Sequence, residues 1–521
     1  MARDESVRVA VRCCPGRAQA ASVNISNKTF ELKRPKTTLT KKIVFQDGVY
    51  SPERDSASVY HEFMSLAIRS AVLNGEHVAA MSFGAAQTGK TTTMTEATKG
   101  AISDVFATLE GQRCANKMVT VSALMSAITA PAQSHMTGRQ VAHEVLLDAL
   151  LPHGGDAPYK GGLHVREHPR TGFFVEGLTQ VAVASEREAR DYVQQAMTNF
   201  EMEKARCGSG GGAPLRVHTL VTLTVWRRMD DGREVVSDVQ LLDLGGWQRA
   251  GNTAKGAKAA SGAADASKAK GGAPAAAAAF EDLVIKAVMR VCDSLEQKMS
   301  HTPYRDSKLT RLLCNALGGR GSCLCALHVG LDNYEETEAM LQFGQRVASI
   351  RNSVSPNSIN YAQLQERHGE RIRQLCKALG RNPQGLKTGG MAMSMASTDE
   401  EVELRDLVAE CESLAELGQR WEFIQERSQR FKSGEGWDVA ARPDRKAPRA
   451  HVSEVGPYDN NKASVPRPKT ERIDPSDTAG KEGGRDSGEG AGASSEISDI
   501  GNKLAQLQMT RKGGSRLRPM S

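Results

Sequence analysis

The sequence is poor in aromatic residues and has no long apolar run. Phe, Trp and Tyr together make up 5% of its 521 residues, whereas hydrophobic residues make up 39% and glycine occurs 49 times. One well-built core diluted by flexible segments is therefore expected. No stretch approaches the about 18 continuous apolar residues of a membrane-spanning helix, so no such span is predicted.

The sequence also lacks a Cys-x-x-Cys pair among its ten cysteines, and its first residues, Met-Ala-Arg-Asp-Glu, contain no apolar signal stretch. These two absences make a reduced, cytosolic setting the default expectation. The net charge of +7 is a modest basic excess, which suits an acidic partner surface. No nucleic-acid partner is expected.

The most informative stretch is residues 81–94, MSFGAAQTGKTTTM. It fits the phosphate-loop pattern G-x-x-x-x-G-K-[ST] at every defined position, and the apolar run Val78–Phe83 before it is typical of a buried strand. In this motif backbone N–H groups surround a phosphate, the lysine reaches the terminal phosphates and the threonine hydroxyl ligates Mg²⁺. An ordinary glycine-rich turn is the alternative. The residues expected to contact phosphate are Gly84, Ala85, Ala86, Gln87, Thr88, Gly89, Lys90, Thr91 and Thr92.

Hydrophobic periodicity predicts alternating strands and helices through residue 352. The strands are expected at 7–11, 78–83, 119–122, 163–167, 172–176, 218–226, 235–242 and 323–329. The helices are expected at 56–74, 144–151, 185–199, about 285–295, before Leu317, and 335–352, with Thr92 and Thr93 starting the one after the phosphate loop. Such alternation is typical of an α/β domain.

Composition divides the rest of the chain. Residues 250–279 form a low-complexity insert of Ala, Gly and Lys, which cannot build a core. Residues 356–432 predict a short helical region, in which a helix over 398–427, capped by Ser397, loses its heptad spacing near Leu417. A long stable coiled coil is therefore not expected. Residues 433–521 are expected to form a mostly disordered basic tail.

Several of these segments together resemble the kinesin motor domain, over roughly residues 5–355. The most specific is 301–313, HTPYRDSKLTRLL, followed by Leu317-Gly-Gly319, which is similar to the tubulin-contacting loop and helix of that family. Residues 336–352 resemble the last helix of the domain, and 352–357 resemble the start of a neck linker. Arg12 and Pro15 match the nucleotide-base motif R-x-R-P, with Cys14 in place of its second arginine.

The resemblance implies a P-loop α/β fold with a central mixed sheet flanked by helices, within an N-terminal motor domain spanning 1–355. It implies ATP and Mg²⁺ as ligands, microtubules (tubulin) as partner, and a location in the cytoplasm on the cytoskeleton. Arg12 and Pro15 would contact the base, and Arg305, Lys308 and Arg311 would face acidic tubulin. The alternative is a solvated basic face in which Arg305 pairs with Asp306. The 250–279 insert is either a further basic contact or a spacer.

The sequence departs from the family at both switches that sense the γ-phosphate. In the first, Arg216 and His218 remain, but Pro214 and Leu215 replace two serines whose hydroxyls would hold the Mg²⁺ shell and the attacking water. In the second, Asp243 and Gly246 remain, but Trp247 replaces a serine and Gln248 the glutamate that pairs with Arg216. The residues expected to carry catalysis are Lys90, Thr91, Arg216, Asp243, Gly246 and Gln248, with Thr91 and Asp243 on the metal.

These substitutions separate nucleotide binding from hydrolysis. The sequence predicts a kinesin-like protein that binds ATP and microtubules with weakened hydrolysis, because phosphoryl transfer depends on positioning groups. The first alternative is an active ATP-driven motor, in which Ser209 or glycine-rich backbone replaces the missing serines. The second is a nucleotide switch with a non-tubulin partner bound through the tail. A weak homodimer through 360–430 is possible on the helical spacing, and the cargo is not specified.

Overall fold

The computed structural model describes residues 2–14, 21–24, 28–33, 40–128, 132–133, 140–141, 143–151, 162–168, 171–208, 217–247, 282–331, 333–383, 386 and 398–434. All of them belong to the structural unit Met1–Asn461. The predictions for Pro15, Arg216, Gln248, the 250–279 insert and the tail after 434 concern residues outside these ranges. Among the described helices, none is long and apolar enough to cross a bilayer.

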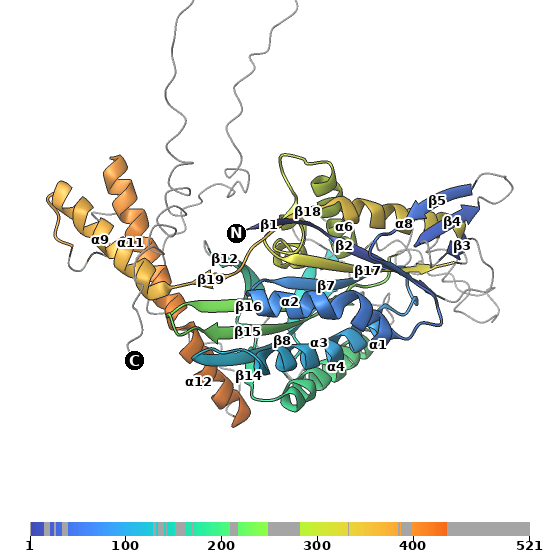
Figure 1. Ribbon diagram of the computed structural model, residues 1–521, viewed down its shortest axis with the longest axis horizontal. Helices are drawn as coiled ribbons and strands as arrows, with labels where there is room; N and C mark the ends of the chain where they lie inside the picture. The colour runs from blue at the N-terminus through green and yellow to red at the C-terminus, as the bar shows by residue number, and fades with distance from the viewer. Residues whose placement is uncertain are drawn as a thin grey trace, which may run out of the picture. The chain divides into compact units, whose positions relative to one another are not determined.

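A mixed β-sheet forms the centre of the molecule (Figure 1). Its strand order is β11 (Glu144–Asp148), β8 (Asn116–Ile128), β15 (Val217–Arg228), β16 (Glu234–Asp243), β7 (Val78–Gly84), β17 (Ser322–Gly330), β2 (Arg8–Cys14) and β6 (Gly48–Tyr50). The strands from β16 to β6 are parallel, and those from β11 to β16 are antiparallel. In addition, β14 (Val181–Val183) pairs with β8, and β19 (Ser358–Ile359) with β16.

Helices cover both faces of this sheet, which explains why its central strand β7 is buried at every residue. One face carries α1 (Ser56–Val59), the π-helix η1 (Tyr60–Ser65), α2 (Leu66–Asn74), α3 (Lys90–Glu110) and α4 (Glu186–Gly208). The other carries α6 (Leu283–Glu296), α7 (Lys308–Leu312) and α8 (Tyr334–Ser349). This is the predicted fold, a central mixed sheet flanked by helices.

Smaller sheets surround the central one. They pair β1 (Arg3–Ser6) with β18 (Arg351–Val354), β9 (Ala132–Gln133) with β10 (Gln140–Val141), and β12 (His164–His168) with β13 (Gly172–Glu176). A further sheet contains β3 (Ala21–Asn24), β4 (Thr29–Lys33) and β5 (Thr40–Val44). The sheets and helices from β1 to α8 together form the head of the molecule. Because β18 pairs with β1 and β19 with β16, the segment that resembles a neck linker runs along this head.

Some local predictions were wrong. The predicted helix at 144–151 does not form, because Glu144–Asp148 pair with Leu124–Ile128 of β8 as strand β11 and a turn follows at 149–151. The helix after the phosphate loop begins at Lys90, before Thr92, and the last helix of the head ends at Ser349, so that Asn352 lies in β18. The helix before Leu317 is the short α7, preceded by the 3₁₀ turn η3 (Tyr304–Asp306).

Within the described residues after 360, three helices follow: α9 (Tyr361–Ala378), α11 (Asp399–Gly418) and α12 (Arg420–Lys432). The cap of α11 is Thr398, which forms a capping box with Glu401, so the predicted cap at Ser397 was one residue early. The break between α11 and α12 at Gln419 lies next to Leu417, where the heptad spacing fails.

Candidate functional site

The phosphate-loop residues lie between the end of β7 and the start of α3. Gly84 has φ +146°, and a Cβ there would lie 2.0 Å from the carbonyl oxygen of His328 in β17, so the turn requires glycine. Gly89, at φ +79°, is the N-cap of α3, and no side chain caps this helix. The first N–H groups of α3 are therefore not occupied by a capping side chain and can donate to a bound anion.

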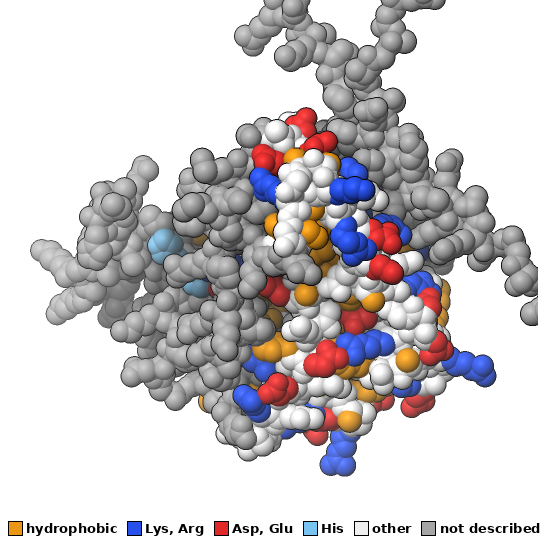
Figure 2. All heavy atoms as spheres, turned by 90° about the vertical axis from the view of Figure 1, so that its left-hand side faces the viewer, with side chains coloured by type: hydrophobic (Ala, Val, Ile, Leu, Met, Phe, Trp, Pro, Cys, Tyr) orange, Lys and Arg blue, Asp and Glu red, His pale blue; other side chains and the backbone are white. Residues whose placement is uncertain are grey.

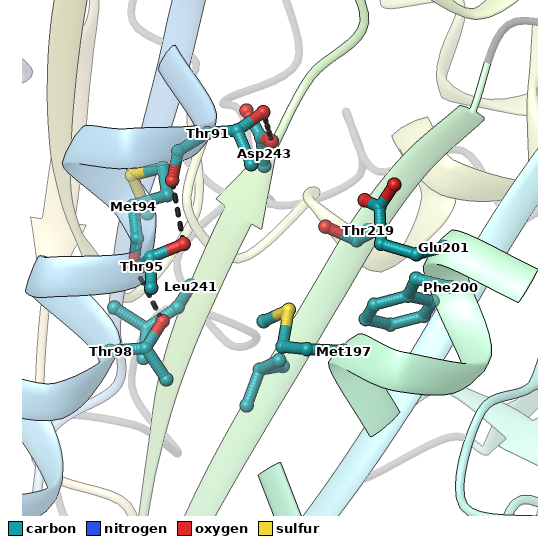
Figure 3. Close-up of a pocket in the computed structure, with 11 residues that line it drawn as sticks. Thr91, Met94, Thr95, Thr98, Met197, Phe200, Glu201, Thr219, Leu241 and Asp243 are labelled. Carbon is teal, nitrogen blue, oxygen red and sulfur yellow. Dashed lines mark hydrogen bonds between the residues drawn. The ribbon is translucent and has the colours of Figure 1, made fainter. Parts of the chain in front are cut away.

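Two side chains from distant parts of the chain meet at this turn. The hydroxyl of Thr91 donates to Oδ2 of Asp243 over 2.6 Å (Figure 3), and that of Ser82 donates to Oδ1 of the same carboxylate over 2.8 Å. Thr91 is exposed, so this hydroxyl–carboxylate pair is open to solvent. A hydroxyl beside a carboxylate is an oxygen donor set that suits Mg²⁺.

Lys90 is turned inward. It is 6% exposed, and its Nζ donates to the Ala85 carbonyl oxygen. Burial lowers the pKa of Lys90, and the nearby Asp243 carboxylate opposes this shift. Because Lys90 bonds Ala85 across the loop, its positive charge lies next to the residues that would surround a phosphate.

The segment that resembles the second switch begins in contact with the phosphate loop. The N–H of Trp247 donates to the Gly84 carbonyl oxygen over 2.9 Å, and Trp247 forms a parallel bridge with Ala85. A Cβ on Gly246 would lie 2.6 Å from Cα of Ala86, so the close approach depends on glycine. Because the bond is made by the main chain, the tryptophan side chain does not prevent it.

A buried histidine, His218, joins the segment that resembles the second switch to helix α6. Nδ1 of His218 accepts the Gly245 N–H over 2.9 Å, and its Nε2 lies 3.3 Å from Oδ1 of Asp282. Asp282 is the N-cap of α6 and accepts the N–H groups of Val284 and Ile285. The sequence pattern had given His218 but not Asp282, although an aspartate directly before an apolar helix is a recognisable cap signal.

A second buried histidine supports the phosphate loop from below. Nδ1 of His328 lies 2.9 Å from the Thr88 carbonyl oxygen, so it carries the proton and donates. Burial lowers the pKa of His328 to about 3, which keeps the ring neutral. Cys14 also donates to that carbonyl, and burial raises the pKa of its thiol to about 11. Nothing in the sequence pattern had singled out His328.

Arg12 lies close to the same loop but points at protein atoms. Its guanidinium donates to the Ser56 hydroxyl over 2.6 Å, to the Thr93 hydroxyl, and to the Arg54 carbonyl oxygen over 3.0 Å. These bonds join β2 to the starts of α1 and α3. The predicted contact between Arg12 and a nucleotide base remains a prediction.

A small pocket lies beside the Thr91–Asp243 pair, between α3 and α4 (Figure 3). Thr95 lines it from α3, and Met197 and Phe200 line it from α4. Thr91, Asp243 and Thr219 bring hydroxyl and carboxylate oxygens to one end of the pocket, whereas Met197 and Leu241 make its other end apolar. The polar end of the pocket therefore lies beside the start of α3, where the phosphate loop ends.

The three cations expected to face tubulin differ in exposure. Arg305 is exposed and lies 3.6 Å from Glu167 of β12, whereas Lys308 and Arg311 are half-buried. Burial lowers the pKa of Lys308, whose Nζ donates to the Leu163 carbonyl oxygen. The local Arg305–Asp306 pair weighed above does not form, because Asp306 pairs with Arg290 over 3.1 Å.

Glu144 holds this loop in place, and the sequence pattern missed it. Its carboxylate accepts the N–H groups of Lys308 and Leu309, over 2.5 and 3.0 Å, at the start of α7. It also accepts the Ser126 hydroxyl over 2.9 Å. Reading 144–151 as a helix had concealed this role, which depends on the pairing of β11 with β8.

Comparison with known proteins agrees with this geometry. The sequence profile of the kinesin motor domain matches residues 15–350. The chain is 27% identical over 376 residues to kinesin-like protein klp-20 of Caenorhabditis elegans, covering 68% of this chain and 52% of that protein. It is 26% identical over 439 residues to kinesin-like protein KIN-14O of Oryza sativa subsp. japonica, covering 79% and 64%. The chain thus spans less than two thirds of either relative.

Solved structures show the same fold. A fast kinesin superposes with a TM-score of 0.53 at 21% identity, covering 68% of this chain and 94% of that one. A KIF14 dimer bound to a microtubule superposes with a TM-score of 0.54 at 18% identity, covering 68% and 96%. The profile match extends over more than half of the chain, and the P-loop, its paired aspartate and the surrounding mixed sheet agree with it. This chain therefore belongs to the kinesin motor-domain family.

Proposed function

We propose that this protein binds Mg·ATP and microtubules and hydrolyses ATP slowly. The observation that carries the proposal is a contrast within one site. The phosphate loop has its full motif, with Thr91 bonded to Asp243, whereas Pro214, Leu215 and Gln248 stand where hydrolysis in this family uses two hydroxyls and a carboxylate.

The residues of the phosphate loop fit a triphosphate. Lys90 and the uncapped start of α3 would hold phosphate oxygens, and Thr91 and Asp243 would hold Mg²⁺. Bound Mg²⁺ would supply positive charge to the phosphates. Binding would break the bond from the Lys90 ammonium to the neutral Ala85 carbonyl oxygen and replace it by one to an anionic phosphate oxygen, in which donor and acceptor are both charged.

Slow hydrolysis follows from the missing groups. Proline and leucine offer no side-chain hydrogen bond to a water, and a neutral glutamine bonds an arginine without charge assistance. Since phosphoryl transfer relies on positioning and charge stabilisation, the loss of several such groups lowers the rate far more than the affinity.

Microtubule binding would involve the loop before α7. Of the three predicted cations Arg305 is the exposed one, so we expect it to contribute more than Lys308 and Arg311 to attraction by an acidic surface, in a manner that salt screens. A solved relative, the KIF14 dimer, is bound to a microtubule. We also propose that the protein is located on cytoplasmic microtubules. The proposed domains are a motor domain at 1–355, a helical region at 356–432 and a basic tail at 433–521.

The second candidate function is an active microtubule motor. The observation that favours it is the segment after α8, in which β18 pairs with β1 and β19 with β16, as an ordered segment leaving the head. Both functions require nucleotide and tubulin and differ in turnover and movement.

One experiment separates them. ATP binding and phosphate release by the full chain are measured with and without microtubules, beside a Lys90→Ala variant. We expect nucleotide binding that Lys90→Ala abolishes, and turnover below about 0.1 s⁻¹ where enzymes commonly exceed about 1 s⁻¹. Rapid microtubule-stimulated release with gliding of microtubules would establish the motor instead. Absence of nucleotide binding would refute both, and a full chain that binds ATP but not microtubules would support a switch with another partner.

A further inference from the structure

Helix α12 lies against the open edge of the central sheet, next to β14 (Figure 1). Trp421 and Ile424 of α12 form a buried apolar cluster with Met118 of β8 and Trp226 of β15. Trp421 is 5% exposed and Ile424 4% exposed. Both side chains are buried by the head although the helix follows it by some sixty residues, so α12 packs as part of the head rather than as a free extension.

Polar contacts continue along the helix from end to end. The hydroxyl of Ser428 accepts the Ala182 N–H over 2.8 Å, which satisfies a backbone donor on the open side of the edge strand β14. Lys432 lies 2.5 Å from Glu188 of α4, and the ring of Phe431 packs near that of Tyr192. An edge strand closed by a helix is no longer available to another chain.

Arg228 connects α12 to the segment that leaves the head. Its guanidinium bonds Glu422 of α12 over 2.6 Å and Glu234 of β16 over 2.8 Å, and it stacks on the ring of Trp421 at 4.7 Å. Glu234 is also the residue that faces Ile359 of β19. Arg228 thus bonds both α12 and β16, and β16 is the strand with which residues 358–359 pair.

The same segment has further bonds to the head beside this point. The N–H of Asn357 donates to the Gly75 carbonyl oxygen over 2.7 Å, and the Val236 N–H donates to the Asn357 carbonyl oxygen over 3.0 Å. Residues 351–359 are therefore bonded to the head between the end of α8 and the start of α9.

The helices between these two points pair with each other. Leu375 and Cys376 of α9 are buried against Leu404 and Val408 of α11. Arg371 of α9 forms an ion pair with Glu403 of α11 over 2.8 Å, and Nε2 of His368 lies 3.4 Å from the Glu410 carboxylate. On the side of the molecule where α9 and α11 lie, Figure 2 shows blue and red side chains interspersed and orange ones in small separate areas. The apolar residues of α9 are thus covered by α11 of the same chain.

We propose that α9, α11 and α12 form an intramolecular clamp. Its docking surface consists of Met118, Ala182, Trp226 and Arg228, and the occupant of this surface is α12 of the same chain. The clamp holds residues 351–360 along the sheet, so that this segment cannot swing away while α12 is bound. In the clamp, α11 covers the apolar face of α9, which a parallel coiled coil with a second chain would need. The full chain is therefore a monomer, in contrast to the weak homodimer through 360–430 considered from the sequence.

The test uses the full chain with the double substitution Trp421→Ala and Ile424→Ala. The matched control is Gln425→Ala with Gln429→Ala on the exposed face of the same helix. Amide hydrogen exchange is followed in peptides that cover 181–183, 351–360 and 420–432, and molecular mass is measured by light scattering. We expect exchange at least tenfold faster in all three peptides of the first variant and unchanged exchange in the control. Wild type and both variants are expected to be monomeric.

Other outcomes overturn the proposal in distinct ways. If the amides of α12 exchange faster but those of 351–360 do not, α12 does not hold residues 351–360. If the wild type is a dimer and the variant a monomer, the occupant of the surface is a second copy. Because the double variant removes two large side chains, Ser428→Ala serves as a milder variant. It should accelerate exchange of the Ala182 amide, and an unchanged rate there would also contradict the clamp.

Discussion

Glu144 is the residue whose replacement most directly tests the loop proposed to face tubulin. Its carboxylate accepts two backbone N–H groups at the start of α7, and no acidic residue lies in the first turn of that helix itself. Glu144→Ala removes both bonds and the negative charge at the helix start. Hydrogen bonds to a charged group contribute about 1.5–3 kcal/mol each, and Ser307 still caps the same turn, so we expect a net loss of about 2–4 kcal/mol.

The measurement is urea unfolding of the full chain, followed through the head. For a slope of about 3 kcal/mol per molar urea, the midpoint should fall by about 1 M. Glu144→Gln keeps an oxygen acceptor without the charge, so its loss should be about half as large. Microtubule co-sedimentation should weaken in the same order, because a loosened α7 no longer fixes Arg305.

The control is Glu110→Ala, which removes an exposed carboxylate at the end of α3. It should change stability by about 0.5 kcal/mol or less. The reasoning is refuted if Glu144→Ala and Glu144→Gln both behave like Glu110→Ala, because the carboxylate would then contribute nothing to the start of α7.

Three further predictions concern the nucleotide site. Asp243→Asn should reduce the Mg²⁺ dependence of nucleotide affinity by about tenfold, measured by titration with a fluorescent nucleotide at varied Mg²⁺, because the oxygen beside Thr91 loses its charge. Gly246→Ala should weaken the same binding, since a Cβ there would lie 2.6 Å from Cα of Ala86, and unchanged affinity would contradict the close approach. His328, with its pKa lowered to about 3, stays neutral in the fold while the unfolded chain takes up a proton below about pH 6.5. Its contribution to stability is therefore complete above pH 6.5 and declines as the pH falls below that value. His328→Asn should reduce the slope of unfolding free energy against pH in this range by up to about 1.4 kcal/mol per pH unit. Identical slopes for the two proteins would rule this out.

The sequence by itself determined the parts whose signal is local. Gly84 to Thr91 are adjacent in the chain, so the turn between β7 and α3 follows from glycine positions and a preceding apolar run. The break at Gln419 was likewise indicated by the slip of heptad spacing near Leu417, and α11 ends between these two residues at Gly418. Such features depend on neighbours within one or two turns, and periodicity reports those neighbours.

Only the tertiary structure decided which distant residues meet. Glu144 reads as part of a helix until β8 pairs with its strand, and it then lies against Leu309, 165 residues away. His328 carries no pattern of its own and becomes a support of the phosphate loop because β17 lies beside β7. Trp421 and Ile424 read as an imperfect heptad, whereas their partners are on β8 and β15. Apolar spacing states that a face will be buried but not against what, because that choice depends on the free energy of the whole packed chain.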